Sequence, residues 1–147
     1  MVRTANKIRL LPGFTLIELL VVIGIIGILA AVVLVAVNPG RQFASGRDTQ
    51  RRADLYSVTN AVYQYAAEKN GNLPTVITTT ATNIGTDTGL VNLSSVLVPT
   101  YLSSTPKDPT TGTDGNTRYK ISKDANSRLT VSADSELNPS TPITITR

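Results

Sequence analysis

The sequence contains no cysteine and no histidine among its 147 residues. Without cysteine the chain has no disulfide bond, no thiolate nucleophile and no cysteine-based metal site. Without histidine it also lacks the commonest general base and the commonest metal ligand. A serine–lysine or carboxylate pair would still be available for catalysis, but no catalytic constellation is recognisable, so the sequence predicts a protein that is not an enzyme.

Charge is sparse and unevenly distributed, with 14 basic and 10 acidic residues and a formal net charge of +4. Arg3, Lys7 and Arg9 precede a long apolar run, with no acid among them. Removing residues 1–13 leaves 11 basic residues against 10 acids, a net charge of +1. A nucleic-acid-binding function therefore loses most of its support if this leader is removed.

The apolar run extends from Leu19 to Val37 without a charged or strongly polar side chain. A helix over residues 14–37 would be about 36 Å long, enough to cross the hydrocarbon core of a bilayer. The run is apolar on all sides, whereas the core helix of a small soluble domain is amphipathic. The residues alone leave two alternatives. One is a secretory signal peptide cleaved near Ala36, although the run is longer than the usual apolar region of such a peptide, and the other is a retained membrane anchor.

The charges that flank the run do not decide the direction in which it would cross a membrane, because basic residues lie on both sides. The arginines that follow it could contact acidic lipid head groups, pair with acids of a neighbouring subunit, or bind DNA. DNA binding is unsupported, because Phe43 alone lies among them and they are not interleaved with a series of aromatic residues for base stacking. These arginines are Arg41, Arg47, Arg51 and Arg52.

Glu18 lies inside the first turns of the apolar segment, although a carboxylate in hydrocarbon costs roughly 2.5–3.5 kcal/mol. The stretch GFTLIE at residues 13–18, with a basic leader before it and an apolar helix after it, resembles the N-terminus of type IV pilins and type II secretion pseudopilins. The resemblance implies that a prepilin peptidase cleaves between Gly13 and Phe14 and that the new Phe14 amine is methylated. It also implies that the leader is cytoplasmic and the rest of the chain lies outside.

Cleavage after Gly13 would create an α-amino group one turn before Glu18. A carboxylate near a helix N-terminus is favoured by the helix dipole, but a buried charge still needs a partner. The Phe14 amine of a neighbouring subunit is a candidate partner, and this pair would fix the axial register of a filament. Thr15, within the same motif, is assigned to the same assembly contact.

Gly24 and Gly27 lie within the apolar segment, where small residues permit close helix packing or local loosening of the helix. Proline and glycine break or kink helices, so we expect an interruption at residues 38–40, which include Pro39 and Gly40. The segment from Gly27 to Pro39 is the predicted region of local melting during assembly.

An amphipathic pattern returns after residue 40, with a helix stop at Lys69-Asn70-Gly71 and Pro74. The helix is therefore predicted from about residue 14 to about residue 70, and its apolar stripe should pack on a globular domain. The stripe comprises Leu55, Val58, Ala61, Val62, Tyr65 and Ala66.

The remaining sequence predicts short elements separated by turns. Residues 72–92 predict a loop with one short strand at 75–79, and residues 93–102 predict a short helix ended by Pro99. Alternating apolar residues predict three later strands. The fold class is therefore α+β: a long N-terminal helix packed on an antiparallel sheet of three to four strands, as in pilins. The alternating residues are Tyr119 and Ile121, then Leu129, Val131 and Ala133, then Ile143 and Ile145.

Four parts follow: a leader at 1–13, a transmembrane or filament-core helix at 14–37, an amphipathic half-helix at 38–71 and a β-rich region at 72–147. Calcium is considered because some pseudopilins hold the last region with this ion. The aspartates there do not have the spacing of a compact calcium loop, and turn formation is the favoured role. No other cofactor is expected. These aspartates are Asp108, Asp114, Asp124 and Asp134.

The function indicated is a structural subunit of a type IV pilus-like filament. The subunit would wait in the inner membrane, surrounded by lipid, and then join an extracellular or periplasmic filament. The implied partners are further copies of the chain, a prepilin peptidase, and an inner-membrane assembly platform with its ATPase. The alternatives are a pseudopilin of a type II secretion system and, from a different class, a single-pass or secreted surface domain that never polymerises.

Overall fold

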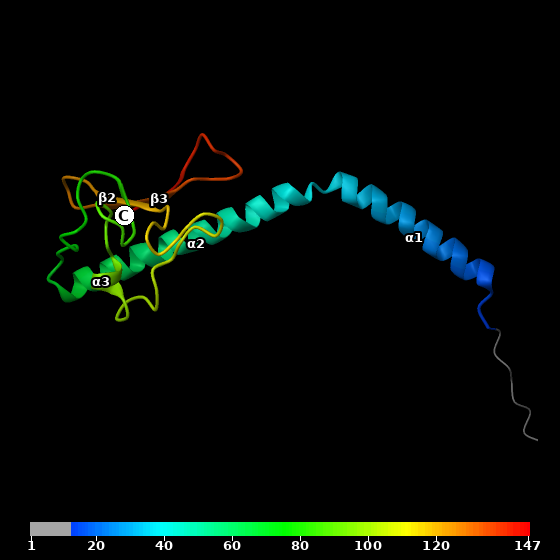
Figure 1. Cartoon of the computed structure of the whole chain (residues 1–147), viewed down its shortest axis with the longest axis horizontal. Helices are drawn as coiled ribbons and strands as arrows, with labels where there is room; N and C mark the ends of the chain where they lie inside the picture. Colours follow the sequence, from blue (N-terminus) through cyan, green and yellow to red (C-terminus); the bar gives the residue numbers. More distant parts are fainter. Residues whose placement is uncertain (1–12) are drawn as a thin grey trace, which may run out of the picture. The chain divides into compact units, whose positions relative to one another are not determined.

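A computed structural model describes residues 13–147. The chain divides into two compact units, one that ends at Pro39 and one that spans Gly40–Arg147. The first unit contains α1, Leu16–Ala36, and the second contains nearly all of α2, Pro39–Glu68, with every later element (Figure 1). A long hydrophobic helix is thus followed by a helix that packs on an antiparallel sheet, which is a pilin-like α+β fold.

The helix α1 has the length and composition of a membrane span. Its 21 residues extend over about 31 Å. Within the part of the chain that the structure describes, none of the α1 side chains is buried. Gly24 and Gly27 lie inside α1 without interrupting it. An entirely apolar helix with no protein cover needs lipid or other helices around it.

The helical path is interrupted at Val37 and Asn38, at the edge of the break predicted for residues 38–40. Val37 is extended, with φ −100° and ψ 103°, and α2 begins at Pro39. Proline suits the first position of a helix because its missing N–H group would have no partner there. The Pro39-Gly40 pair therefore starts a new helix and does not kink a continuous one.

The C-terminal end of α2 has the predicted stop. Asn70 and Gly71 both take left-handed backbone conformations, with φ values of 55° and 85°. The Gly71 amide donates to the Ala66 carbonyl at 2.8 Å, which satisfies one of the last carbonyls of the helix.

Four short strands form an antiparallel sheet in the order β1-β2-β3-β4. Three of them correspond to the strands predicted after residue 118, and the turn between β2 and β3 closes through the Ser127 amide, which donates to the Asp124 carbonyl at 3.0 Å. The helix predicted within residues 93–102 is also present, as α3, Ser94–Leu97. The strands are β1 at Thr82–Asn83, β2 at Lys120–Lys123, β3 at Leu129–Ala133 and β4 at Ile143–Thr146.

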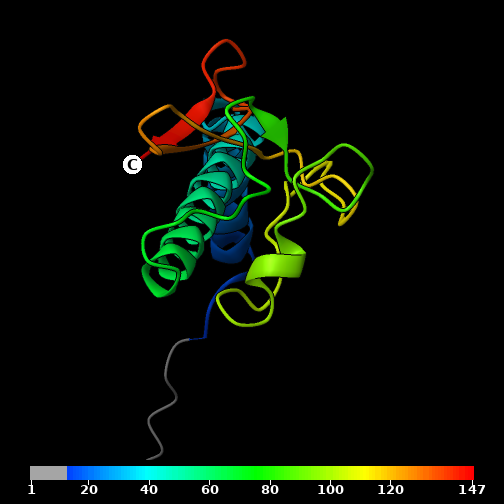
Figure 2. The same ribbon diagram turned by 90° about the vertical axis from the view of Figure 1, so that its left-hand side faces the viewer.

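The sheet lies along one side of α2 (Figures 1 and 2). Alternate residues of β3 and β4 point inward, as the period of two requires. They meet the predicted stripe of α2, of which Leu55, Val58 and Val62 are fully buried. Tyr119, just before β2, is also fully buried, and its hydroxyl donates to Asp54 Oδ2 at 2.7 Å.

The strand predicted at residues 75–79 is absent from the described chain, whose first strand is β1. The Ile77 amide donates to the Pro74 carbonyl at 3.0 Å, so this segment forms a turn. The turn buries Ile77 in the core, and its neighbours remain exposed. The turn that begins at Pro74 outweighs the β propensity of residues 75–79.

We expect Leu55→Ala to lower the free energy of unfolding by about 2–5 kcal/mol, because it leaves a cavity between α2 and the sheet. Urea unfolding of the detergent-solubilised chain, followed by circular dichroism, measures the loss. The control is Ser57→Ala on the exposed side of α2, which should change stability by less than about 0.5 kcal/mol. Equal effects of the two substitutions would contradict this arrangement of the core.

Candidate functional site

The N-terminal motif forms the start of α1 through a reciprocal pair of contacts. Thr15 is the N-cap, and its Oγ1 accepts from the Glu18 amide at 3.2 Å. Glu18 Oε2 in turn accepts from the Thr15 amide at 2.8 Å and from the Thr15 hydroxyl at 2.7 Å. This capping box satisfies donors of the first turn that water could not reach in a bilayer.

The two residues that flank the predicted cleavage site precede α1 and are exposed. Phe14 is 87 % exposed. A Cβ built on Gly13 would meet no atom within 4 Å, so the backbone there stands clear of the rest of the described chain. The peptide bond between Gly13 and Phe14 is therefore accessible to an enzyme.

The predicted site residues thus fall into three groups along the chain. Thr15 and Glu18 are in direct contact, and Gly13 and Phe14 lie immediately before them. The remaining four residues do not contact Thr15 or Glu18: two lie inside α1 and two begin α2. These four are Gly24, Gly27, Pro39 and Gly40.

A second group of polar residues lies in the globular unit and centres on Arg51, whose side chain is only 3 % exposed. Its guanidinium donates to three carboxylates from separate parts of the chain. Nη1 reaches Asp48 Oδ1 at 2.8 Å, Nε reaches Asp108 Oδ2 at 2.6 Å, and Nη2 reaches Glu136 Oε1 at 2.6 Å. We call these four residues the Arg51 cluster. Arg47 joins its edge, with Nη2 at 2.6 Å from Glu136 Oε2.

Asp48 holds the segment after β3 against α2. Its carboxylate accepts from the Ser135 hydroxyl at 2.6 Å and from the amides of Glu136 and Leu137 at 3.0 and 3.2 Å. Burial alone would raise the pKa of Asp48, but these hydrogen bonds and the Arg51 guanidinium lower the pKa to about 2. Asp48 is therefore ionised at every physiological pH.

Asp108 fixes a second loop in the same way. Besides Arg51, it accepts from the amides of Thr110 and Thr111, both at 2.9 Å. Burial opposes ionisation, yet these donors hold the pKa of Asp108 well below its usual range. In the described residues 13–147, no buried side-chain nitrogen or oxygen lacks a hydrogen-bond partner. The Arg51 cluster therefore binds two C-terminal loops to one helix with its polar groups satisfied.

The roles predicted for the basic residues beyond the apolar run were wrong for Arg51, which is buried among carboxylates of its own chain and cannot reach head groups or neighbouring subunits. Arg47 pairs with Glu136 and remains partly exposed. Their partners Asp108 and Glu136 lie far along the sequence, so local charge counting could not identify them. Arg41 and Arg52 are exposed.

The Arg51 cluster was not identified from the sequence. A signal was present, because Asp48 and Arg51 continue the spacing of the buried stripe that includes Leu55 and Val58. Charged residues in line with a core stripe must find partners when the stripe is covered. Ser135 and Glu136 carried no comparable signal.

The calcium hypothesis gains no support from the acidic side chains of the described residues, where no group of three or more histidine, cysteine, aspartate or glutamate residues is placed to hold a metal ion. The aspartates instead organise turns and surface pairs. Asp124 Oδ1 accepts from the amides of Asn126 and Arg128, both at 2.8 Å. Asp114 pairs with Lys107 at 2.8 Å.

One comparison with known proteins identifies the N-terminal segment. The family model described as the prokaryotic N-terminal methylation motif matches residues 12–34. This motif is typical of type IV pilins and type II secretion pseudopilins, and it implies processing by a prepilin peptidase. Comparison with curated proteins and with solved structures gave no match.

Motif and fold together define a prepilin-like protein. Pilin-like proteins are generally structural and not enzymatic. The hydrophobic helix and the motif indicate a chain that is first anchored in a membrane and then exported or incorporated into a filament.

We expect the free energy of unfolding to be constant from neutral pH down to about pH 5 and to fall between about pH 4 and pH 2. The pKa of Asp48 is lowered from 3.8 to about 2 on folding, so its stabilisation is complete above the unfolded value and is lost as pH falls through the folded one. This one group accounts for about 2 kcal/mol. Urea unfolding across this pH range measures the slope.

Two variants make this test specific. Asp48→Asn should be less stable at neutral pH and should show a shallower decline between about pH 4 and pH 2. Asp134→Asn is the matched control, because the Asp134 side chain is 84 % exposed and lies 3.9 Å from Lys120. If the acid slope of Asp48→Asn equals that of the unsubstituted chain, Asp48 does not carry the pH dependence.

Proposed function

We propose that this chain is the structural subunit of a type IV pilus-like filament. The observation that carries the proposal is the methylation motif at residues 12–34, which continues into an apolar helix with no buried side chain in the described chain. Such a surface is stable only in lipid or among copies of itself. The globular unit is attached to one end of this helix and would form the filament surface.

Processing would occur between Gly13 and Phe14, followed by methylation of the Phe14 amine. The exposure of both residues supports access by the peptidase and the methylating enzyme. Because the cut precedes α1, the mature subunit retains its hydrophobic helix. It would remain in the inner membrane until a platform protein and an ATPase transfer it to the growing filament.

Glu18 would supply the axial register by pairing with the Phe14 amine of the neighbouring subunit. The capping box supports this role, because Thr15 already binds the Glu18 carboxylate and restricts its direction. Thr15 is thus a positioning residue for the contact. A charge pair formed away from water is strong only when its geometry is fixed in advance.

The helical residues Gly24 and Gly27 and the break at Pro39 and Gly40 would allow the helix to adapt on leaving lipid. Gly27 to Pro39 is the segment proposed to loosen. The fold of the single subunit does not require glycine at either position, since a Cβ at Gly24 or Gly27 would meet no atom within 4 Å.

N-terminal sequencing and mass spectrometry of the mature chain test the processing step. We expect a chain that starts at Phe14 with one added methyl group. A chain that starts near Val37 would indicate an ordinary secreted domain and would contradict the proposal. The same preparation distinguishes a retained α1 from a lost one.

Glu18→Ala and Glu18→Gln test the register contact. We expect both variants to be cleaved normally and to yield at least about tenfold fewer filaments, because each removes the charge that pairs with the amine. Glu18→Gln keeps an oxygen that can accept from Thr15, so it separates helix capping from charge pairing. Assembly of Glu18→Ala at the unsubstituted rate contradicts the contact.

Electron microscopy of cells with and without the gene assigns the filament type. Long surface filaments that need the gene, with normal protein secretion in its absence, support the pilus. Loss of secretion without loss of surface filaments would assign the same subunit chemistry to a secretion pseudopilus.

A further inference from the structure

Phe43 is an unexplained apolar side chain on the globular unit. It is 68 % exposed, although it lies on a helix whose other side forms the core. On its own face of α2, the residues one turn away are Pro39, Gly40, Gly46 and Arg47. Three of these offer little or no apolar cover, so nothing in the fold of this unit shields the ring.

The position of Phe43 along the chain suggests what covers it. α1 extends about 31 Å, which matches the ~30 Å hydrocarbon core, so the chain leaves the core near Ala36. Pro39 lies at most about 10 Å from Ala36, and Phe43 lies about 6 Å further along α2, whereas each polar layer of a bilayer is about 5–8 Å thick. The first turns of α2 therefore fall in the head-group layer or at its outer edge.

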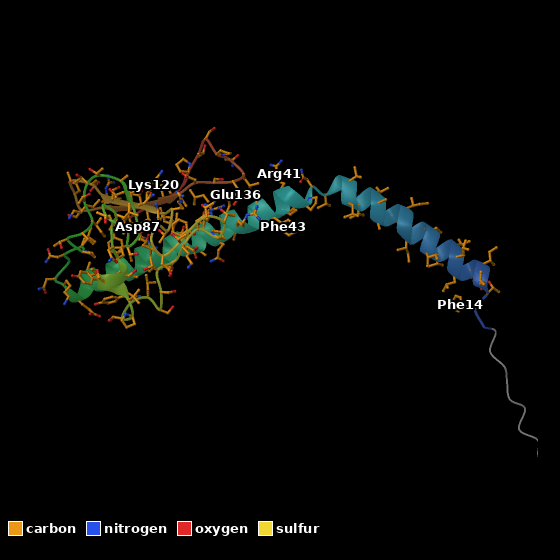
Figure 3. The ribbon with its side chains drawn as sticks, in the orientation of Figure 1. Phe14, Arg41, Phe43, Asp87, Lys120 and Glu136 are labelled. Atoms are coloured by element: carbon orange, nitrogen blue, oxygen red, sulfur yellow. The ribbon has the colours of Figure 1, made fainter. Side chains whose placement is uncertain are left out.

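The charges of these turns fit a head-group layer. Between Pro39 and Arg47 the sequence contains no acid, and Arg41 is exposed. Arg41 is the first basic residue after α1. Arg41 and Phe43 point to different sides of α2 (Figure 3). A long basic side chain can extend to phosphate while an aromatic ring enters the interface.

The two phenylalanines of the whole chain thus flank the apolar helix. Phe14 lies just before α1 and Phe43 lies shortly after it (Figure 3). We propose that residues 39–43 of the membrane-inserted monomer lie in the lipid head-group layer, with Phe43 as the interfacial anchor. This inference rests on the proposed membrane insertion of α1 and adds a lipid contact made by the globular unit.

The absence of tryptophan from the chain gives a direct test, because each variant then carries a single tryptophan, which can be excited selectively over the tyrosines. Phe43→Trp reports on the proposed anchor. Tyr56→Trp is the matched control, since Tyr56 is 46 % exposed on the same helix and about 20 Å further along. Ile26→Trp, in the middle of α1, reports whether the helix is inserted.

The full-length variants are reconstituted at high lipid excess in phosphatidylcholine–phosphatidylglycerol vesicles. The lipids are brominated either near the head groups or near the ends of the acyl chains. We expect Phe43→Trp emission to be blue-shifted and to fall by roughly half with the shallow bromines. Ile26→Trp should be quenched by the deep bromines, and Tyr56→Trp by neither.

The outcomes separate this inference from the proposed function. Quenching of Ile26→Trp with Phe43→Trp behaving like Tyr56→Trp would overturn the anchor and leave membrane insertion standing. Blue-shifted Phe43→Trp emission without quenching would mean that protein covers the ring, as in contact with a second copy, and would also overturn it. Absence of quenching for Ile26→Trp would contradict the membrane insertion of α1 itself.

Discussion

The pairing of Arg51 with three carboxylates is the interaction on which the globular unit depends. The guanidinium pairs with Asp48 on its own helix, with Asp108 in one loop and with Glu136 in another. A buried ion pair is strongly destabilising when one member is lost, because the remaining charge has no water around it. The chain has no cysteine and so no disulfide bond, and the Arg51 cluster instead attaches the two C-terminal loops to α2.

The apolar parts of the fold could be predicted from the sequence, since periodicity alone identifies them. The buried stripe of α2 and the inward residues of β3 and β4 follow the periods of helix and strand. The motif at residues 13–18 could also be recognised in the sequence, because its residues are contiguous. The partners of Arg51 could not be predicted. Their encounter depends on how the loops fold back, and no local pattern encodes a contact between Asp48 and Ser135.

The two units place opposite demands on their surroundings. α1 exposes apolar side chains everywhere and needs lipid or other helices, whereas the globular unit buries its apolar residues and satisfies its polar ones. The short interruption at Val37 and Asn38 lies between the apolar helix α1 and the globular unit. Phe43 lies just beyond it and is the most exposed large apolar residue that the structure describes in the globular unit. If the chain passes from lipid to a filament as proposed, the surroundings of Phe43 must change as well as those of α1.

The order of elements along the chain has a consequence for folding. The stripe of α2 is complete by Ala66, yet the strands that cover it come from the second half of the sequence, and the last of them begins at Ile143. A chain synthesised from its N-terminus therefore carries an uncovered stripe until β4 has been made. Contacts between distant segments form slowly and leave apolar surface open to misassociation. The globular unit is therefore complete only once β4 has paired with β3.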